Sequence, residues 1–380
     1  MTKLIYLDHA ASTPLDPRVK KEMDAVKTYA NPSALHQMGL EAKEIFHQAR
    51  NKVAKILNCK AEEIIFTSGG TESINLAIKG IAKRKGHIIT SKIEHPAVLE
   101  TCKYLERNGF SVTYLNVDKD GLVNLKYLEK EIKKDTILIS IMYANNEIGT
   151  VQPVKEIAKI ANKHKVPFHT DACQAGFLDL NVGADLMTLN GSKIYGPKGI
   201  GILFVKKGIK LEPLMHGGGQ EFGLRSGTEN LTAIVGFSKA LELAQKEDNK
   251  KIEKLRNDFI EKVLKEIPRS FLNGHKTKRL PNNANISFLD VEGESILLYL
   301  DHEGILVSTG SACSSEKLEV SHVLDSIGLK HDAAHGSIRF SLGKSTTKED
   351  LNYVVKKLKG IISSLRRISP VHLNKEEIRQ

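Results

Sequence analysis

The sequence has 380 residues, of which 41% are apolar and 27% charged, and its formal net charge is +11. This length exceeds what one hydrophobic core usually organises, so two domains are expected, and no apolar run is long enough to suggest a membrane role. Basic residues are interleaved with acidic ones instead of clustering with aromatic residues, which argues against nucleic-acid binding. Residues 1–17 lack the apolar stretch of a secretory signal, so a cytoplasmic protein is expected.

Apolar spacing predicts alternating helices and strands from residue 41 onward. A helical face over residues 42–57 precedes a strand at 64–67. Further strands are expected at 87–90, 111–115, 136–142, 166–170 and 184–189, with helices at 94–107 and 154–164 between them. Continuously apolar runs such as TILISIM are typical of strands that helices cover on both faces. The pattern predicts an α/β fold with a mostly parallel sheet.

After about residue 230 the sequence becomes rich in lysine and glutamate. A single helix over 231–267 is expected to bridge two domains, and a last helix spans 351–365 after a possible capping box of Thr347 and Asp350. We therefore expect a large domain over residues 15–255. Residues 1–14 and 256–380 would form a smaller α+β domain.

The segment IIFTSGGTESINLAIKG is expected to form a strand, a turn and a helix that begins near Glu72. Gly70 and its neighbour Gly69 let the backbone approach a ligand, the helix amino terminus offers unpaired N–H groups, and Thr71 adds a hydroxyl donor. This arrangement predicts an anion site. By itself the signal is weak, because glycine turns before helices are common.

Two charged residues stand at expected strand ends. Asp171 follows an apolar strand, which places a carboxylate where ligands of α/β proteins usually bind, although alone it could cap a turn. Lys193 lies among glycines and Pro197 and is therefore expected in an enclosed segment. A phosphate cradle, a carboxylate and a lysine in this order are the parts of a pyridoxal 5'-phosphate site. The phosphate anchors the cofactor, the carboxylate keeps the pyridine nitrogen protonated and the lysine binds the aldehyde.

The chain resembles, nearly from end to end, the fold-type I pyridoxal-phosphate enzymes of the NifS/IscS group of cysteine desulfurases, in the class-V aminotransferase family. The blocks that carry the resemblance are YLDHAASTPLDPRV, NPSALH, FTSGGTES, EHPAV, ANNEIG, HTDACQ, KIYGPKGIG, HGGGQE, RSGTEN, PNNANISF, VEGESILL, STGSACSS, IRFSLG and LRRISP. It implies a large domain with a mostly parallel sheet flanked by helices and a smaller α+β domain that carries a catalytic cysteine loop.

The resemblance also implies roles for single residues. Lys193 would bind the cofactor covalently, Asp171 would contact its pyridine nitrogen, and His95 would stack on its ring and share proton transfers with Lys193. Arg339 matches the arginine that binds the substrate carboxylate. The other implied contacts are Gln174 with the ring hydroxyl, Asn146 with cofactor and substrate carboxylate, Gly70 and Thr71 with the phosphate, and Thr228 with the phosphate of the other subunit of a homodimer.

Four cysteines are scattered without a CxxC pair, so neither a disulfide framework nor a metal ligand set is expected. Cys59, Cys102 and Cys173 are interpreted as structural. Cys313 lies among small and polar residues with little to bury, and it matches the family nucleophile that takes sulfur from the substrate.

One block departs from the family pattern. The family commonly has serine, any residue, histidine and then the lysine, whereas this chain has Asn190, Gly191, Ser192 and Lys193. Asn190 and Ser192 can still donate hydrogen bonds to a phosphate, but the imidazole is lost.

The resemblance therefore implies a homodimeric cysteine desulfurase that converts L-cysteine to L-alanine and leaves a persulfide on Cys313. An iron-sulfur scaffold protein or another acceptor would receive the sulfur. A selenocysteine lyase or another pyridoxal-phosphate lyase or transaminase would share Lys193 and Asp171 without needing Cys313. A non-enzymatic assembly subunit is suggested only by Asn190 and Ser192.

Overall fold

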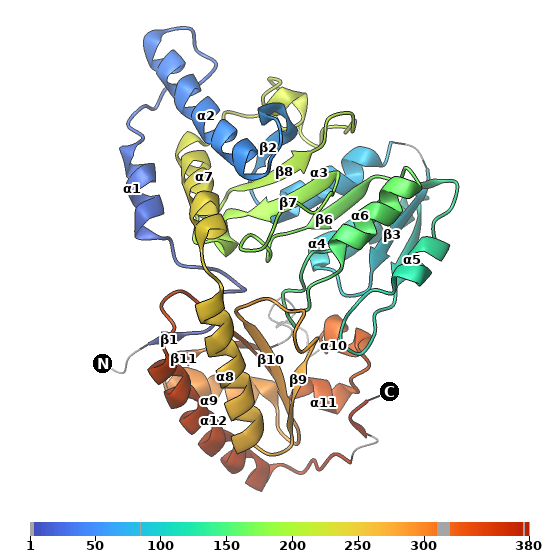
Figure 1. Cartoon of the computed structure of the whole chain (residues 1–380), viewed down its shortest axis with the longest axis vertical. Helices are drawn as coiled ribbons and strands as arrows, with labels where there is room; N and C mark the ends of the chain where they lie inside the picture. Colours follow the sequence, from blue (N-terminus) through green and yellow to red (C-terminus); the bar gives the residue numbers. More distant parts are fainter. Residues whose placement is uncertain (1–3, 84, 310–319, 375–376, 380) are drawn as a thin grey trace.

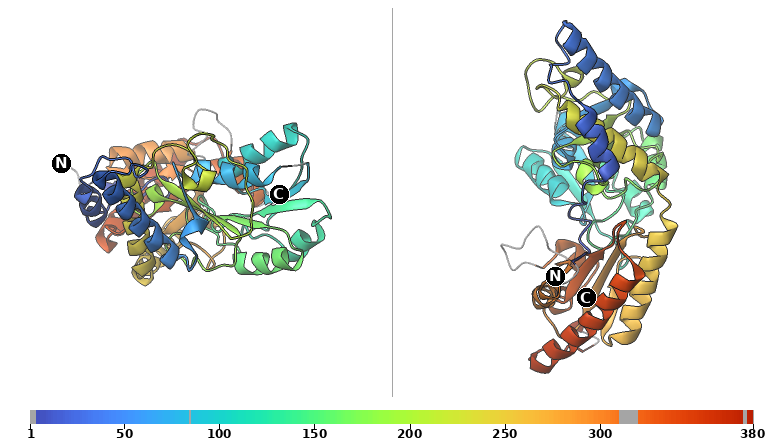
Figure 2. Two further views of the ribbon diagram at one scale, coloured as in Figure 1. Left: turned by 90° about the horizontal axis from the view of Figure 1, so that it is seen from above. Right: turned by 90° about the vertical axis from the view of Figure 1, so that its left-hand side faces the viewer.

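The computed structural model describes residues 4–83, 85–309, 320–374 and 377–379, which fold around two main sheets (Figure 1). Each sheet has its own hydrophobic core, and the two lie in opposite halves of an elongated molecule (Figure 2). We call the half around the seven-stranded sheet the large region and the half around the four-stranded sheet the small region.

The sheet of the large region is parallel except for β8, which runs antiparallel to both of its neighbours. Its strands, in spatial order, are β2 (Ile64–Thr67), β8 (Gly201–Val205), β7 (Leu186–Asn190), β6 (Phe168–Asp171), β5 (Thr136–Ser140), β3 (His87–Ser91) and β4 (Ser111–Leu115). The parallel strands bring the carboxyl ends of β5, β6 and β7 to one edge. Parallel α/β sheets bind their ligands at this edge.

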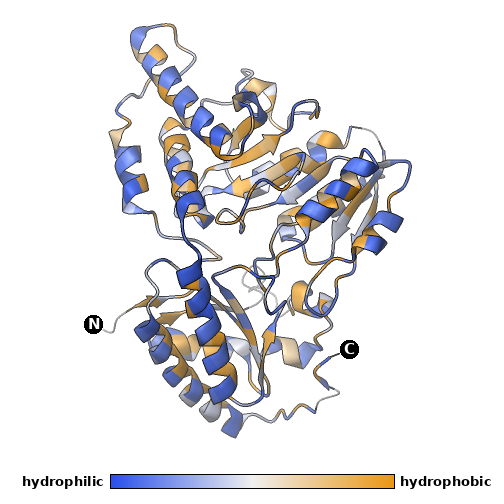
Figure 3. Ribbon diagram, viewed as in Figure 1, coloured by the Kyte–Doolittle hydropathy of each residue, from blue (hydrophilic) through white to orange (hydrophobic). Residues whose placement is uncertain are grey.

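Helices cover both faces of this sheet, which explains the continuously apolar strands. Ile88 packs against α3 (Gly70–Ile81) and α4 (Pro96–Arg107), whereas the next residue, Ile89, belongs to the core under α2 (Gln37–Ile56), α6 (Val154–Lys163) and α7 (Leu231–Lys246). Successive side chains of a strand point to opposite faces, so both must be apolar. Figure 3 shows the apolar strands in the middle and polar positions on the outer sides of the helices. The remaining helices here are α1 (Pro17–Ala25) and α5 (Leu125–Lys130), with 3-10 turns at Ala61–Glu63, Gly191–Lys193 and Glu221–Gly223.

The small region has an antiparallel sheet with helices packed against it. Its strands, in spatial order, are β12 (Ser308–Thr309), β13 (Ser337–Ser341), β10 (Asn283–Phe288) and β9 (Ser270–Asn273). Its helices are α8 (Lys250–Glu266), α9 (Gly293–His302), α10 (His322–Ser326), α11 (His331–His335) and α12 (Lys348–Ile368). The amino-terminal strand β1 (Ile5–Tyr6) joins this region by parallel pairing with β11 (Ile305–Leu306). The first residues of the chain and its carboxyl-terminal half thus share one core.

The single helix expected over residues 231–267 is a wrong prediction. The structure has two helices, α7 and α8, and between them Glu247 adopts an extended conformation. The side chain of Asn249 donates to the carbonyl of Phe177, 2.7 Å away. The break lies where the chain passes from α7, in the core of the large region, to α8, in the core of the small region (Figure 1).

Most other expected elements agree with the structure, with shifted ends. The capping box of Thr347 and Asp350 is confirmed at the start of α12. The strand expected to reach residue 142 ends at Ser140, because the N–H of Met142 bonds to the carboxylate of Glu94 instead of a neighbouring strand. The helix expected to begin near Glu72 begins at Gly70. None of the described helices has the length and apolar composition that a bilayer crossing needs.

Candidate active site

A cavity of about 300 Å³ lies where the carboxyl edge of the large sheet meets the small region. Nine of the residues selected from the sequence line it: Gly70, Thr71, His95, Asn146, Asp171, Gln174, Asn190, Lys193 and Arg339. Ser192 and Thr228 are not among the lining residues, and Thr228 is exposed. Cys313 lies outside the described residues. Gly70 and Arg339, the first and last of these nine residues, are 269 positions apart in the chain.

The start of α3 forms the end of the cavity at which the sequence predicts an anion site. Gly69 has a φ of 152°, in the region that favours glycine, and Gly70 is the first helical residue. A Cβ at Gly70 would stand 2.7 Å from Sγ of Cys173, so the helix end approaches the neighbouring loop as closely as a residue without a side chain allows. The backbone N–H groups of a helix start favour an anion at this position.

Cys173 lines this end of the cavity, although its sequence context had indicated only a structural role. Burial is the largest cause that raises the pKa of its thiol well above the usual value, and the nearby Asp171 carboxylate adds to the shift. The thiol is therefore protonated at neutral pH and makes a poor nucleophile.

Asp171 ends β6, and its carboxylate is buried in the cavity wall. One oxygen, Oδ1, accepts the backbone N–H of Cys173 at 2.9 Å, which fixes the carboxylate to its own turn. Below it, His169 bonds through its two ring nitrogens to Ser140 and Thr188, and burial lowers the pKa of this imidazole to about 4. His169 is thus neutral, and its ring supports the strand end without adding charge.

His95 caps the amino terminus of α4. Its Nδ1 accepts the backbone N–H of Ala97 at 3.1 Å, so the neutral ring carries its proton on Nε2. Burial is the largest cause that lowers the pKa of His95, and the charge of Lys193 lowers it further, whereas Asp171 acts in the opposite direction. The imidazole is therefore neutral at neutral pH and has a single N–H, on Nε2.

Lys193 contacts an amino-terminal segment, residues 8–16, which we call the strap. The Nζ of Lys193 donates to the carbonyl of Ala11, and the side-chain amide of Gln174 donates to the carbonyl of Ala10 at 2.9 Å. Thr13 donates to the carbonyl of Ser192 through both its N–H and its hydroxyl. The strap therefore contributes to the cavity wall, through Ala10 and Ala11.

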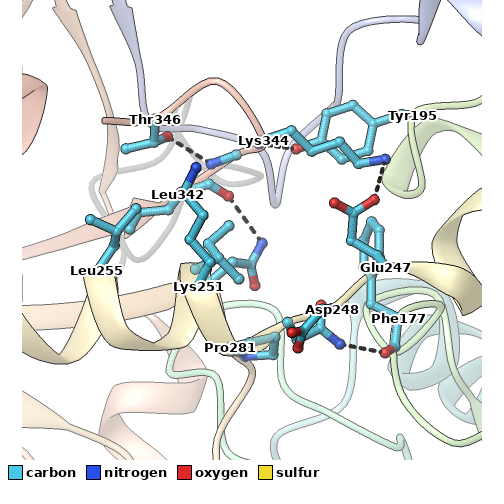
Figure 4. Close-up of a pocket in the computed structure, with 14 residues that line it drawn as sticks. Phe177, Tyr195, Glu247, Asp248, Lys251, Leu255, Pro281, Leu342, Lys344 and Thr346 are labelled. Carbon is cyan, nitrogen blue, oxygen red and sulfur yellow. Dashed lines mark hydrogen bonds and ion pairs between the residues drawn. The ribbon is translucent and has the colours of Figure 1, made fainter. Parts of the chain in front are cut away.

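Tyr195, two residues after Lys193, has a φ of 62°, which is unusual for a bulky residue. The strap supports this conformation, because Thr13 accepts the N–H of Tyr195 at 2.8 Å and Asp16 donates to its carbonyl at 3.0 Å. Its ring lines a second cavity, of about 140 Å³, beside the ion pair of Lys344 and Glu247 (Figure 4). A residue in such a conformation, two positions from a lysine that lines the cavity, is typical of a functional site.

Arg339, in β13, forms the other end of the cavity and is 3% exposed. Its Nη2 pairs with Asp8 of the strap at 2.8 Å, and its Nη1 donates to the carbonyl of Asn146 at 3.2 Å. Its Nε is buried and has no partner in the described structure. A buried guanidinium with an unused donor is suited to bind a carboxylate that enters the cavity.

Two buried carboxyl groups beside the cavity had no role in the sequence analysis. Burial raises the pKa of Glu147 to about 7, although the Ser321 hydroxyl and the charge of Arg339 counteract it. Burial likewise raises the pKa of Glu94 to about 8, against hydrogen bonds from Ser91 and Met142. Glu94 lies in the block EHPAV and Glu147 in ANNEIG, where polar neighbours such as His95 and Asn146 gave no sequence signal that either carboxyl would be buried.

Asn190 and Ser192 are bonded to each other. The hydroxyl and the N–H of Ser192 both lie 3.2 Å from Oδ1 of Asn190. Asn190 lines the cavity, so its amide is the group that can reach a ligand there. The two residues that replace the usual family pair therefore differ in their access to the cavity: Asn190 lines it, and Ser192 does not.

Comparisons with known proteins identify the family of the chain. The chain matches the aminotransferase class-V family over residues 5–354. It is 54% identical to a cysteine desulfurase IscS of Dictyoglomus turgidum, with 97% of each chain covered. It is similar to the solved structure of a NifS-like protein, with a TM-score of 0.89, 41% identity, and 96% and 100% of the two chains covered. It is also similar to a structure of SspA in complex with cysteine, with a TM-score of 0.80, 40% identity, and 89% and 98% covered. The fold expected from the sequence is confirmed.

Proposed function

We propose, from the premise that this chain belongs to the class-V aminotransferase family, that it is a cysteine desulfurase dependent on pyridoxal 5'-phosphate. It would convert L-cysteine to L-alanine and retain the sulfur as a persulfide on Cys313. The observation that carries the proposal is the cavity itself, in which Lys193, Asp171 and His95 lie opposite the buried Arg339 with its unpaired Nε.

The residues present fit the cofactor. The close approach at Gly70 and the start of α3 suit its phosphate, and the buried carboxylate of Asp171 suits a protonated pyridine nitrogen. Lys193 is the lysine that lines the cavity and would bind the aldehyde. When bound, the cofactor withdraws electrons from the substrate and so allows its carbon–sulfur bond to break.

The protein's own residues divide the remaining tasks. Arg339 would bind the substrate carboxylate with its unused donor, and Asp8 would keep the guanidinium in place. His95 is neutral before the substrate binds, and its Nδ1 accepts the N–H of Ala97. Its Nε2 is therefore the atom at which a proton would be exchanged. The Cys313 thiolate, outside the described residues, would attack the substrate sulfur, so that the sulfur–carbon bond breaks and alanine forms after protonation.

The homodimer, the sulfur acceptor and the compartment also belong to the proposal. Thr228 is exposed and does not line the cavity of its own chain, as a residue that reaches the site of another subunit would be. An iron-sulfur scaffold protein is the proposed acceptor because of the names of the relatives. A cytoplasmic location is proposed because persulfide chemistry needs a compartment that keeps thiols reduced.

The test is to reconstitute the purified protein with pyridoxal 5'-phosphate, add L-cysteine, and measure alanine and sulfide. We expect equal amounts of both in the presence of a reductant, loss of sulfide release in Cys313→Ala, and a borohydride-trapped adduct at Lys193. An adduct without alanine formation from cysteine would overturn the desulfurase assignment. A much higher rate with selenocysteine would favour a selenocysteine lyase instead.

A further inference from the structure

Two histidines face each other on the surface of the small region. His331 and His335 are the first and last residues of α11, one helical turn apart, so their side chains lie on the same side of the helix. Their Nε2 atoms are 3.2 Å apart, and their ring centroids are 4.3 Å apart. The side chain of His331 is 68% exposed and that of His335 is 23% exposed, so solvent reaches both rings.

The other nitrogen of each ring faces a carboxylate. Nδ1 of His331 is 3.3 Å from Oδ1 of Asp332, and Nδ1 of His335 is 3.8 Å from Oε2 of Glu292 at the start of α9. A carboxylate at Nδ1 favours the tautomer with the proton on that nitrogen. It thereby leaves the lone pair on Nε2, as in most histidines that bind metals. Two such lone pairs that face each other need a proton or a cation between them.

From this geometry we propose that His331 and His335 form a binding site for a divalent transition metal ion such as Ni²⁺, Cu²⁺ or Zn²⁺. With metal–nitrogen bonds of about 2.0–2.1 Å, nitrogens 3.2 Å apart subtend an angle of about 100° at the metal. This lies between the octahedral and the tetrahedral angle. Imidazole selects these ions, whereas Mg²⁺ and Ca²⁺ require oxygen ligands.

The site supplies two protein ligands. In the described residues, no group of three or more histidine, cysteine, aspartate or glutamate side chains is arranged to hold a metal. The remaining positions around the ion are therefore left to water or to a ligand from another molecule, as in metal sites that keep open positions. Neither histidine lines the active-site cavity, so the site is independent of the proposed desulfurase reaction.

The test uses Ni²⁺–nitrilotriacetate as the probe, because this chelate leaves two adjacent positions open and requires two nitrogens at the spacing found here. Isothermal titration of the holoenzyme should give one bound chelate per chain. His331→Ala and His335→Ala should each lower the affinity at least about tenfold, and Asp332→Asn and Glu292→Gln by a smaller factor. His302→Ala, an exposed single histidine on α9, is the matched control and should leave the affinity unchanged.

Circular dichroism and desulfurase activity of the alanine variants should equal those of the unmodified protein, which separates metal binding from folding. Absence of binding to the unmodified protein would overturn the proposal. An affinity of His331→Ala for the chelate equal to that of the unmodified protein would also overturn it, because the metal would then bind elsewhere. So would displacement of the chelate by Mg²⁺ at a concentration no higher than the Zn²⁺ concentration that displaces it.

Discussion

The two ends of the active-site cavity are built differently. At the cofactor end, Asp171 accepts a backbone N–H, His95 caps a helix and Gly70 lies against Cys173, so the polar groups already have partners within the large region. At the substrate end, Arg339 has a buried donor without a partner, and burial raises the pKa of Glu147. The comparison teaches that the polar groups named at the proposed cofactor end are held by the protein itself, whereas at the proposed substrate end one buried donor still needs an acceptor, which the carboxylate of the proposed substrate would supply.

The strap connects the two ends. Asp8 pairs with Arg339, while the carbonyl of Ala11 accepts the Nζ of Lys193. The backbone of the strap also bonds to β13, since Ser341 accepts the N–H of His9 through its carbonyl and that of Ala10 through its hydroxyl. One short segment therefore contacts both ends of the cavity.

Arg339→Ala should have the largest effect and should act on the substrate end alone. It removes the carboxylate ligand and leaves Asp8 without its partner, so kcat/KM for cysteine should fall at least about 100-fold, or about 3 kcal/mol. The absorbance of the bound cofactor should persist. Arg339→Lys, which keeps the charge but loses the planar fork, should recover only part of the activity. Equal loss of cofactor in Arg339→Ala would show that the two ends are one unit.

Glu147→Gln tests how much an ionised carboxyl at the substrate end lowers the free energy of unfolding. The pKa of Glu147 is raised from 4.5 to about 7 by burial, so the folded state binds the proton more tightly than the unfolded state. Its effect on the free energy of unfolding is therefore absent below about pH 4.5. As pH rises from 4.5 to 7, the protein should lose up to about 3 kcal/mol of stability.

The amide variant resembles the protonated acid and should lack this loss, so its melting temperature should exceed that of the unmodified protein by more at pH 8 than at pH 5. Thermal unfolding across this range is the measurement. A difference in melting temperature that does not change with pH would contradict the raised pKa.

Gly70→Ala should act on the cofactor end. The added Cβ would stand 2.7 Å from Sγ of Cys173, and such overpacking costs about 1–2 kcal/mol, or roughly tenfold in cofactor affinity. The double variant Gly70→Ala with Cys173→Ala should regain most of this affinity, because the second change removes the clashing sulfur. Cofactor titration by absorbance measures both. Failure of the double variant to recover would mean that Gly70 is needed for its backbone conformation instead.

Ser192→Ala should have the smallest effect. Its hydroxyl lies against Asn190 and the residue does not line the cavity, so cofactor affinity should fall no more than about twofold. Asn190→Ala should cost more, because Asn190 does line the cavity. If Ser192→Ala weakened the cofactor more than Asn190→Ala, Ser192 would have to turn towards the phosphate when it is bound.

The sequence by itself determined most of the large region and selected nine residues that line one cavity. Apolar runs located the strands of the large sheet except β8 (Gly201–Val205), which was not predicted. The carboxyl ends of parallel strands meet at one edge, so Asp171 and Asn190 could be expected near one another. Strand ends were less certain: the regular strand ends at Ser140, and the N–H of Met142 bonds to the carboxylate of Glu94, 48 positions away. The break between α7 and α8 likewise depends on two cores that no local pattern contains.

Only the tertiary structure decided which groups are buried without partners and which segments connect the two ends. Asp8 and Arg339 are 331 positions apart, and nothing in either local sequence specifies that they pair. The raised pKa of Glu147 and the orphaned Nε of Arg339 follow from the same cause. Periodicity and turn residues act over a few positions of the chain, whereas desolvation and charge pairing depend on distances that only the folded chain sets.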